Sequence, residues 1–128
     1  MPDKNNCAPR PPMGWNSWDC YGAAVNEEQL LGNAEYMRDN LKEYGWEYVV
    51  CDIQWSEPTA VGYAYNNFVE LYMDEYSRLI PAVNRFPSSA DGVGFKATRK
   101  TRGIPFVIPP KMPPAWLVFV ITFPSTIQ

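Results

Sequence analysis

An aspartate at the end of an apolar run is the first candidate for chemistry in this sequence. Residues 48–51 read Tyr-Val-Val-Cys, and Asp52 follows them directly. Such a run is typical of a strand that is buried on both faces, inside which an unpaired carboxylate would be costly. We therefore expect Asp52 where the strand ends, which is the edge at which α/β barrels assemble their active sites. The alternative is that its carboxylate only caps a nearby loop N–H.

Three tryptophans are the other candidates for ligand binding. Trp15 and Trp18 lie close together near the start of the chain, and Trp55 follows Asp52. An indole ring can stack on the apolar face of a sugar and can donate its N–H. Strand alternation places Trp15 and Trp18 on opposite faces, so at least one of them is expected in the core. We favour Trp18 for the ligand side because it lies nearer the carboxyl end of its strand. Trp15 and Trp55 stay as further candidates, with a core role as the alternative.

The remaining acids and the missing residue types limit the chemistry further. Glu57, Asp74 and Glu75 are loop acids, and a pair of carboxylates is what glycoside hydrolysis needs. Solvated loop charge explains them better, so we assign no catalytic residue. The chain has no histidine, which excludes Ser-His-Asp and Cys-His catalysis and histidine metal sites on this chain. The cysteines number three at irregular spacing and do not favour zinc, so we expect no metal and no cofactor.

Composition narrows the classes of partner and the compartment. The formal net charge is -3 and there is no basic stripe, so we expect no nucleic acid as partner. The apolar run 116–123 is too short to span a bilayer, so we expect no membrane contact. Residues 1–7 are polar and contain no apolar signal-peptide core, so we expect a cytoplasmic protein with reduced thiols and at most one disulfide.

The elements that must position these side chains form a β-strand, α-helix, β-strand unit. We predict a strand at about 12–18, a helix at about 27–44 and a strand at about 47–53. Asn26 is a good N-cap, and Gln29 occupies the matching capping-box position. One apolar stripe runs along the predicted helix at spacings of three and four, and a glycine suited to the C-cap follows it: Leu30, Ala34, Met37, Leu41, Tyr44 and then Gly45. The pattern indicates parallel strands of a barrel or of a doubly wound sheet.

The rest of the chain divides into a long loop and a tail of different composition. Residues 54–87 read as an insertion-like loop, with short strand pieces near 69–73 and 78–83. Residues 1–96 carry all 14 acidic residues and a net charge of -7, whereas residues 97–128 carry no acid and a net charge of +4. Six of the 13 prolines lie in the tail, where they exclude a helix. Within the tail, the run 116–123 is strand-like or aggregation-prone.

Several segments, in order, resemble the N-terminal part of glycoside hydrolase family 27, the α-galactosidases and α-N-acetylgalactosaminidases. Residues 11–18 read PPMGWNSW, and residues 44–52 read YGWEYVVCD. The resemblance resumes at the RFP of 85–87 and at the GFK of 94–96. The segment 73–81, MDEYSRLIP, is similar to the bacterial branch of the family. The resemblance covers about residues 9–96.

This resemblance implies a fold, a reaction and two binding residues. The implied fold is a (β/α)₈ barrel, of which the chain would hold the N-terminal βαβ portion. The implied reaction is retaining hydrolysis of terminal α-galactosides or α-N-acetylgalactosaminides by two aspartates, and neither catalytic position exists in this chain. Trp18 corresponds to a tryptophan that stacks on the sugar after the first strand. Asp52 corresponds to the first of two adjacent aspartates that bind sugar hydroxyls, and the second of these is Ile53 here. The cysteine that often follows is Gln54, so the usual disulfide from the first loop, where Cys20 lies, has lost its partner.

The resemblance ends where the composition changes. After Lys96 the family would continue into a helix that begins Pro-Leu-Ala, whereas this chain reads Ala-Thr-Arg. Codons for the latter, read one base later, can encode the former. We therefore expect residues 1–96 to be part of a glycoside hydrolase barrel, and residues 97–128 to be a frameshifted or disordered tail.

Three functional hypotheses follow from the sequence. The first is a fragment of an α-galactosidase-type glycoside hydrolase that is inactive by itself. The second is a non-catalytic carbohydrate-binding module, in which Trp15, Trp18 and Asp52 bind the sugar. The third is a small interaction domain in which the apolar tail is a docking strand.

Overall fold

The computed structural model describes residues 11–64, 66, 72–90, 106–107 and 119–122. It is an α/β arrangement in which helices connect and cover a small sheet. In chain order the elements are β1 (Met13–Asn16), α1 (Ser17–Tyr21), η2 (Gly22–Ala24), α2 (Glu27–Asn40), η3 (Lys42–Tyr44), β2 (Trp46–Cys51), η4 (Pro87–Ser89), β3 (Phe106–Val107) and β4 (Phe119–Thr122). No helix among the described residues is long and apolar enough to cross a membrane.

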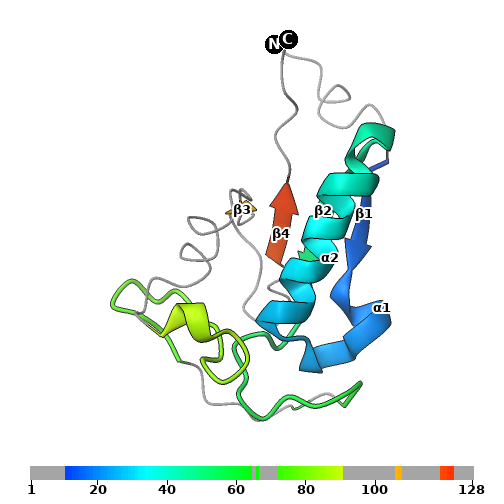
Figure 1. Cartoon of the computed structure of the whole chain (residues 1–128). Coiled ribbons are helices and arrows are strands. Elements are labelled where there is room, and N and C mark those ends of the chain that lie inside the picture. Colours follow the sequence, from blue (N-terminus) through cyan, green and yellow to red (C-terminus); the bar gives the residue numbers. More distant parts are fainter. Residues whose placement is uncertain (1–10, 65, 67–71, 91–105, 108–118, 123–128) are drawn as a thin grey trace.

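The sheet has the order β1-β2-β4-β3, with β1 parallel to β2 and β4 antiparallel to β2 (Figure 1). The predicted strand–helix–strand unit with parallel strands is therefore confirmed. Gly14 lets the two parallel strands approach closely, because a Cβ atom there would lie 2.3 Å from the carbonyl oxygen of Tyr48. The strand-like character predicted for 116–123 is confirmed for β4, which pairs Phe119 with Cys51 and Thr122 with Tyr48.

The first predicted strand is too long, and this changes the environment of Trp18. The strand ends at Asn16, whose side-chain oxygen accepts a hydrogen bond from the backbone N–H of Trp18 at 2.9 Å. This N-cap starts α1 at Ser17, so Trp18 lies on a helix rather than on a strand. The strand-alternation argument for the two tryptophans is therefore wrong, because only Trp15 belongs to the strand.

Helix α2 begins where the sequence predicts, and it ends four residues earlier. Asn26 and Gln29 form the complete capping box, with both reciprocal hydrogen bonds present. The α-helix ends at Asn40, and the 3₁₀ turn η3 follows before Gly45, which has φ of 88°. Because a 3₁₀ turn has a different period, Tyr44 leaves the apolar stripe and is 68% exposed, so its predicted burial is wrong.

The core lies between α2 and the sheet, and α2 runs along β1 and β2 in Figure 1. Its buried members come from α2, from β2, and from the segments around them: Val25, Leu30, Leu31, Ala34, Met37, Val49, Cys51, Trp55 and Phe86. Leu31 is buried although it lies beside the predicted stripe. The core therefore holds α2 against β2 and continues past the carboxyl end of β2 to Trp55.

The long loop contains less strand than expected. Within 72–90, the backbone of Met73 and that of Leu79 form one isolated bridge, and Ile80 N donates to Tyr72 O at 2.8 Å. Much of the predicted piece 69–73 lies outside the described residues. The expected boundary at Lys96 lies outside them as well, and only β3 and β4 are described within the expected tail.

Candidate functional site

A partly buried hydrogen bond joins the carboxyl ends of β1 and β2. Asp52 follows β2 directly, and its backbone N–H donates to Oγ of Ser17 at 2.9 Å. Ser17 is fully buried and begins α1, directly after β1. Because the two strands are parallel, this bond fixes the two strand ends at the same edge of the sheet. It brings the segment that carries Trp18 next to the segment that carries Asp52.

The carboxylate of Asp52 is partly buried at this edge. Its Oδ1 accepts a hydrogen bond from the backbone N–H of Ile53 at 2.7 Å, which is the loop-capping role that the sequence left as the alternative. Its Oδ2 accepts no hydrogen bond from any residue in the described part of the chain. One carboxylate oxygen therefore orients the group, and the second can accept a hydrogen bond from a ligand hydroxyl.

Trp18 is half-buried in α1 and forms an edge-to-face pair with Tyr63. The ring centroids lie 5.6 Å apart at an interplanar angle of 84°. The hydroxyl of Tyr63 donates to the backbone oxygen of Asp19 at 3.2 Å. The aromatic pair therefore belongs to the same edge of the sheet as Ser17.

Trp15 and Trp55 pack with the hydrophobic core. Trp15 is partly buried against the core cluster, and its ring meets Tyr21 edge to face at 6.1 Å. Trp55 is 1% exposed and is itself a member of the cluster. Both residues occupy the core positions that the sequence left open as the alternative to ligand binding.

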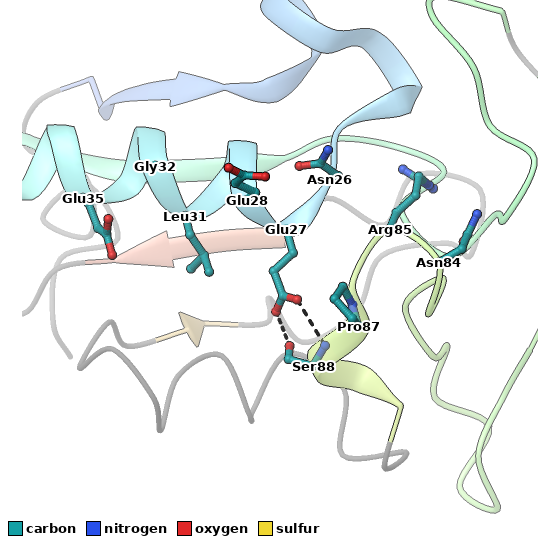
Figure 2. A pocket seen from close by; sticks show the side chains of 10 residues that line it. All are labelled: Asn26, Glu27, Glu28, Leu31, Gly32, Glu35, Asn84, Arg85, Pro87 and Ser88. Carbon is teal, nitrogen blue, oxygen red and sulfur yellow. Dashed lines mark hydrogen bonds between the residues drawn. The ribbon is translucent and has the colours of Figure 1, made fainter.

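A groove of about 720 Å³ lies beside the start of α2. Figure 2 shows its lining, in which Glu27 reaches across to the backbone N–H and hydroxyl of Ser88 while Arg85 points away from Ser88. Neither Trp18 nor Asp52 lines this groove. The structure thus brings the two main sequence candidates to one edge of the sheet without enclosing them in that groove.

Comparison with solved structures identifies the family. A β-L-arabinopyranosidase of glycoside hydrolase family 27 from Geobacillus stearothermophilus, solved in complex with arabinose, is 63% identical with a TM-score of 0.68, and the match covers 74% of this chain and 22% of that enzyme. The chain belongs to glycoside hydrolase family 27. A Bacillus halodurans C-125 protein with the provisional name α-N-acetylgalactosaminidase is 68% identical, with a TM-score of 0.59, over 70% of this chain and 21% of that protein.

Curated relatives of this family 27 chain include α-galactosidases from yeasts. The enzyme of Zygotorulaspora mrakii is 33% identical over 87 residues, which cover 67% of this chain and 16% of the enzyme. That of Lachancea cidri is 41% identical over 56 residues, which cover 43% of this chain and 12% of the enzyme. The chain therefore spans less than a quarter of the length of these relatives. No protein-family model matches it.

Two of the three loop acids of this family 27 chain, Glu57 and Asp74, have structural partners. Glu57 is 6% exposed, and its Oε1 accepts from the backbone N–H and the hydroxyl of Thr59 at 2.9 and 2.7 Å. Asp74 accepts from the backbone N–H of Arg78 at 2.9 Å and from its Nε at 2.6 Å, and these bonds hold the pKa of Asp74 below its usual value. Glu75 is exposed. Glu57 and Asp74 therefore stabilise turns of the loop.

Arg85 is a structural residue that sequence reasoning missed. Its guanidinium is buried, and it donates to the backbone oxygens of Ala23, Val25 and Glu57 at 2.8 Å each and also to that of Gln54. Burial lowers the pKa of Arg85 from its ordinary value. Its Nε is the buried side-chain atom without a partner among the described residues. The signal in the sequence is an arginine in the RFP segment with no acid beside it.

Removing the hydroxyl of Ser17 tests the bond between the strand ends. In Ser17→Ala the backbone N–H of Asp52 loses its acceptor, so we expect destabilisation of about 1–2 kcal/mol and faster hydrogen exchange of the Asp52 amide. Two-dimensional NMR of the labelled chain measures the exchange, and urea unfolding measures the stability. Ser17→Thr keeps the hydroxyl and should restore slow exchange. Equal exchange rates in wild type and Ser17→Ala would contradict the assigned bond.

The two described cysteines should differ strongly in reactivity. Cys20 is exposed, whereas Cys51 is fully buried in β2, and burial raises the pKa of its thiol from 9.0 to about 12. At pH 8, iodoacetamide should therefore label Cys20 and leave Cys51 unlabelled in the folded chain, as peptide mass spectrometry would detect. Labelling of both thiols at equal rates would contradict this environment for Cys51.

The same thiol makes the stability depend on alkaline pH. Below about pH 9 the thiol of Cys51 is protonated in both the folded and the unfolded chain, so it does not make stability depend on pH there. Above pH 9 the unfolded chain releases this proton and the folded chain retains it up to about pH 12. Unfolding is then favoured by roughly 1.4 kcal/mol for each pH unit in that window. Cys51→Ala should flatten this part of the profile.

Proposed function

We propose that this chain forms the first part of a (β/α)₈ barrel of a retaining glycoside hydrolase, and that it contributes to the wall that binds the terminal sugar. The supporting observation is the hydrogen bond from Asp52 N to Ser17 Oγ, which joins two parallel strand ends at their carboxyl edge. In α/β barrels this edge carries the active site. The likeness to a family 27 enzyme at 63% identity supports the same placement.

In this proposal Trp18 and Asp52 bind the sugar, and the hydrolysis itself depends on residues outside the chain. The indole of Trp18 supplies an apolar surface for a pyranose ring, and Oδ2 of Asp52 accepts a hydrogen bond from a ring hydroxyl. The two aspartates that would act as nucleophile and as acid/base belong to later parts of the family 27 barrel. The chain by itself therefore binds sugar without turnover.

The substrate class is a terminal α-galactoside or the β-L-arabinopyranoside that shares its ring stereochemistry. The two sugars differ in that the pentopyranose lacks the exocyclic CH₂OH group. Ile53 stands beside Asp52 where the family has a second aspartate, and an isoleucine side chain cannot accept a hydrogen bond from an additional hydroxyl. This substitution favours the pentopyranoside, which is what the Geobacillus stearothermophilus relative is named for.

Calorimetric titration of the whole chain with L-arabinose, D-galactose and N-acetylgalactosamine tests the proposal. We expect saturable binding that is strongest for L-arabinose. Asp52→Asn should weaken it roughly 10- to 100-fold, because a hydrogen bond to a charged acceptor is lost. Asp39→Asn is the matched control, since Asp39 pairs with Arg38 on the exposed surface of α2 and should leave sugar affinity unchanged. Absence of saturable binding to all three sugars would contradict the proposal.

A non-catalytic carbohydrate-binding module is the second candidate, and it would use the same sugar-binding side chains, Trp18 and Asp52. Turnover of 4-nitrophenyl β-L-arabinopyranoside and 4-nitrophenyl α-galactoside is assayed with the chain alone and with the chain mixed with a complementary enzyme part. Turnover by the purified chain would contradict both interpretations of it as a binding element. When the chain is mixed with the remaining length of a family 27 relative, turnover above the background of that part alone would favour the barrel over the module.

A further inference from the structure

Tyr63 is an exposed aromatic side chain that is held in place at both ends. It is 60% exposed, yet its ring packs edge to face against Trp18 and its hydroxyl donates to the backbone oxygen of Asp19. An exposed tyrosine without such contacts would sample several rotamers. Here the orientation of the ring is fixed before any ligand arrives.

The backbone that carries Tyr63 is fixed as well. The N–H of Ala23 donates to the carbonyl oxygen of Gly62 at 2.7 Å, and a Cβ atom on Gly22 would lie 2.2 Å from that same oxygen. The turn is closed by a bond from Ala64 N to Val61 O at 3.2 Å. The loop segment 61–64 is therefore docked on η2 at a distance that only glycine at position 22 allows.

The fixed ring adjoins the proposed sugar-binding residues. Trp18 follows Ser17, whose hydroxyl accepts a hydrogen bond from the backbone N–H of Asp52, so contacts connect Tyr63 with the backbone of Asp52. A ring packed edge to face against its neighbour keeps at least one of its own faces clear of that contact. A glycoside bound through its terminal sugar would therefore have a further aromatic surface beside that sugar.

We propose that Tyr63 contacts the leaving-group side of the glycoside, as an aromatic surface for the ring bonded to the terminal sugar. The inference rests on the function proposed above and deepens it. The ligand chemistry is a ring with an apolar face, which either a second sugar or an aryl group supplies. Tyr63 then discriminates between a free monosaccharide and a glycoside, whereas Asp52 binds both.

Titrations with matched ligand pairs test this inference on the whole chain. The pairs are L-arabinose with 4-nitrophenyl β-L-arabinopyranoside, and D-galactose with 4-nitrophenyl α-galactoside. Tyr63→Ala should weaken binding of each nitrophenyl glycoside roughly three- to tenfold and leave affinity for the free sugars unchanged. Tyr63→Phe retains the ring and should stay within twofold of wild type. Tyr44→Ala removes a similarly exposed tyrosine at the opposite end of β2. It should leave the affinity for both ligands of each pair unchanged.

The outcomes separate this inference from the function on which it rests. Equal affinity of wild type and Tyr63→Ala for the nitrophenyl glycosides, with sugar binding still sensitive to Asp52→Asn, would overturn the role of Tyr63 alone. If Tyr63→Ala lost equal affinity for the free sugar and for its glycoside, that result would also overturn the inference, because Tyr63 would then contact the terminal sugar. Absence of binding by the wild-type chain would overturn the proposed function and this inference together.

Discussion

Replacement of Arg85 with methionine is expected to unfold most of the chain at 25 °C. The guanidinium supplies hydrogen bonds to four backbone oxygens, which come from the segment before α2 and from the loop after β2. Methionine fills a similar volume and leaves these oxygens without their donor. Each unsatisfied buried acceptor costs about 1–3 kcal/mol, so the loss exceeds about 4 kcal/mol and approaches the whole stability of a small domain.

Urea titration followed by circular dichroism measures this loss of unfolding free energy. Two other arginine variants serve as comparisons. Arg85→Lys retains the charge but offers a single ammonium in place of a planar fork, so it should recover only part of the stability. Arg78→Met removes an exposed arginine that pairs with Asp74, and it should cost less than about 1 kcal/mol. If Arg85→Met and Arg78→Met were equally stable, the buried network would not hold these segments together.

Gly22→Ala is expected to lower the free energy of unfolding strongly, though less than Arg85→Met does. Its φ of 57° lies in the left-handed region, and the added Cβ would meet the carbonyl oxygen of Gly62 at 2.2 Å. The conformation alone costs about 1 kcal/mol for a residue with a Cβ, and the collision with backbone forces the loop 61–64 away from η2. We expect a total of about 3 kcal/mol and loss of the Trp18–Tyr63 contact, measured by urea unfolding and tryptophan fluorescence.

Two other glycines separate the conformational cost from the steric one. Gly45 has φ of 88°, and no atom lies within 4 Å of the position that a Cβ would take, so Gly45→Ala should cost only about 1 kcal/mol. Gly32 lies inside α2 with the same open space, and Gly32→Ala should stabilise the chain by up to about 1 kcal/mol. A Gly22→Ala variant no less stable than Gly45→Ala would contradict the close contact with Gly62.

The sequence predicts the local elements well where each depends on its own residues. The capping box of Asn26 and the apolar spacing along α2 place that helix, and the apolar run before Asp52 places β2. The end of β1 is missed because the side chain of Asn16 caps a short helix. This hydrogen bond starts α1 at a point where the strand could otherwise have continued. The antiparallel pairing of β4 with β2 is missed because register between segments about 70 residues apart depends on tertiary contacts.

The candidate site is predicted less completely than the fold. The sequence identifies Asp52 and Trp18 as candidates because their residue types and their predicted strand ends point to one edge. Ser17 and Tyr63 are not identifiable this way, since a serine in a motif and a tyrosine in a loop acquire their roles only through partners 35 and 45 residues away. Arg85 is missed for the same reason, because its acceptors are backbone oxygens that sequence patterns do not mark.

The direction of β4 has a consequence for assembly. Strand β4 runs antiparallel to β2 and occupies the hydrogen-bonding groups on the side of β2 away from β1. A parallel neighbour needs those same N–H and C=O groups, so it can add there only after β4 has been displaced. A parallel strand can therefore pair with this side of β2 only by exchange with β4, at a rate that depends on how fast residues 119–122 detach.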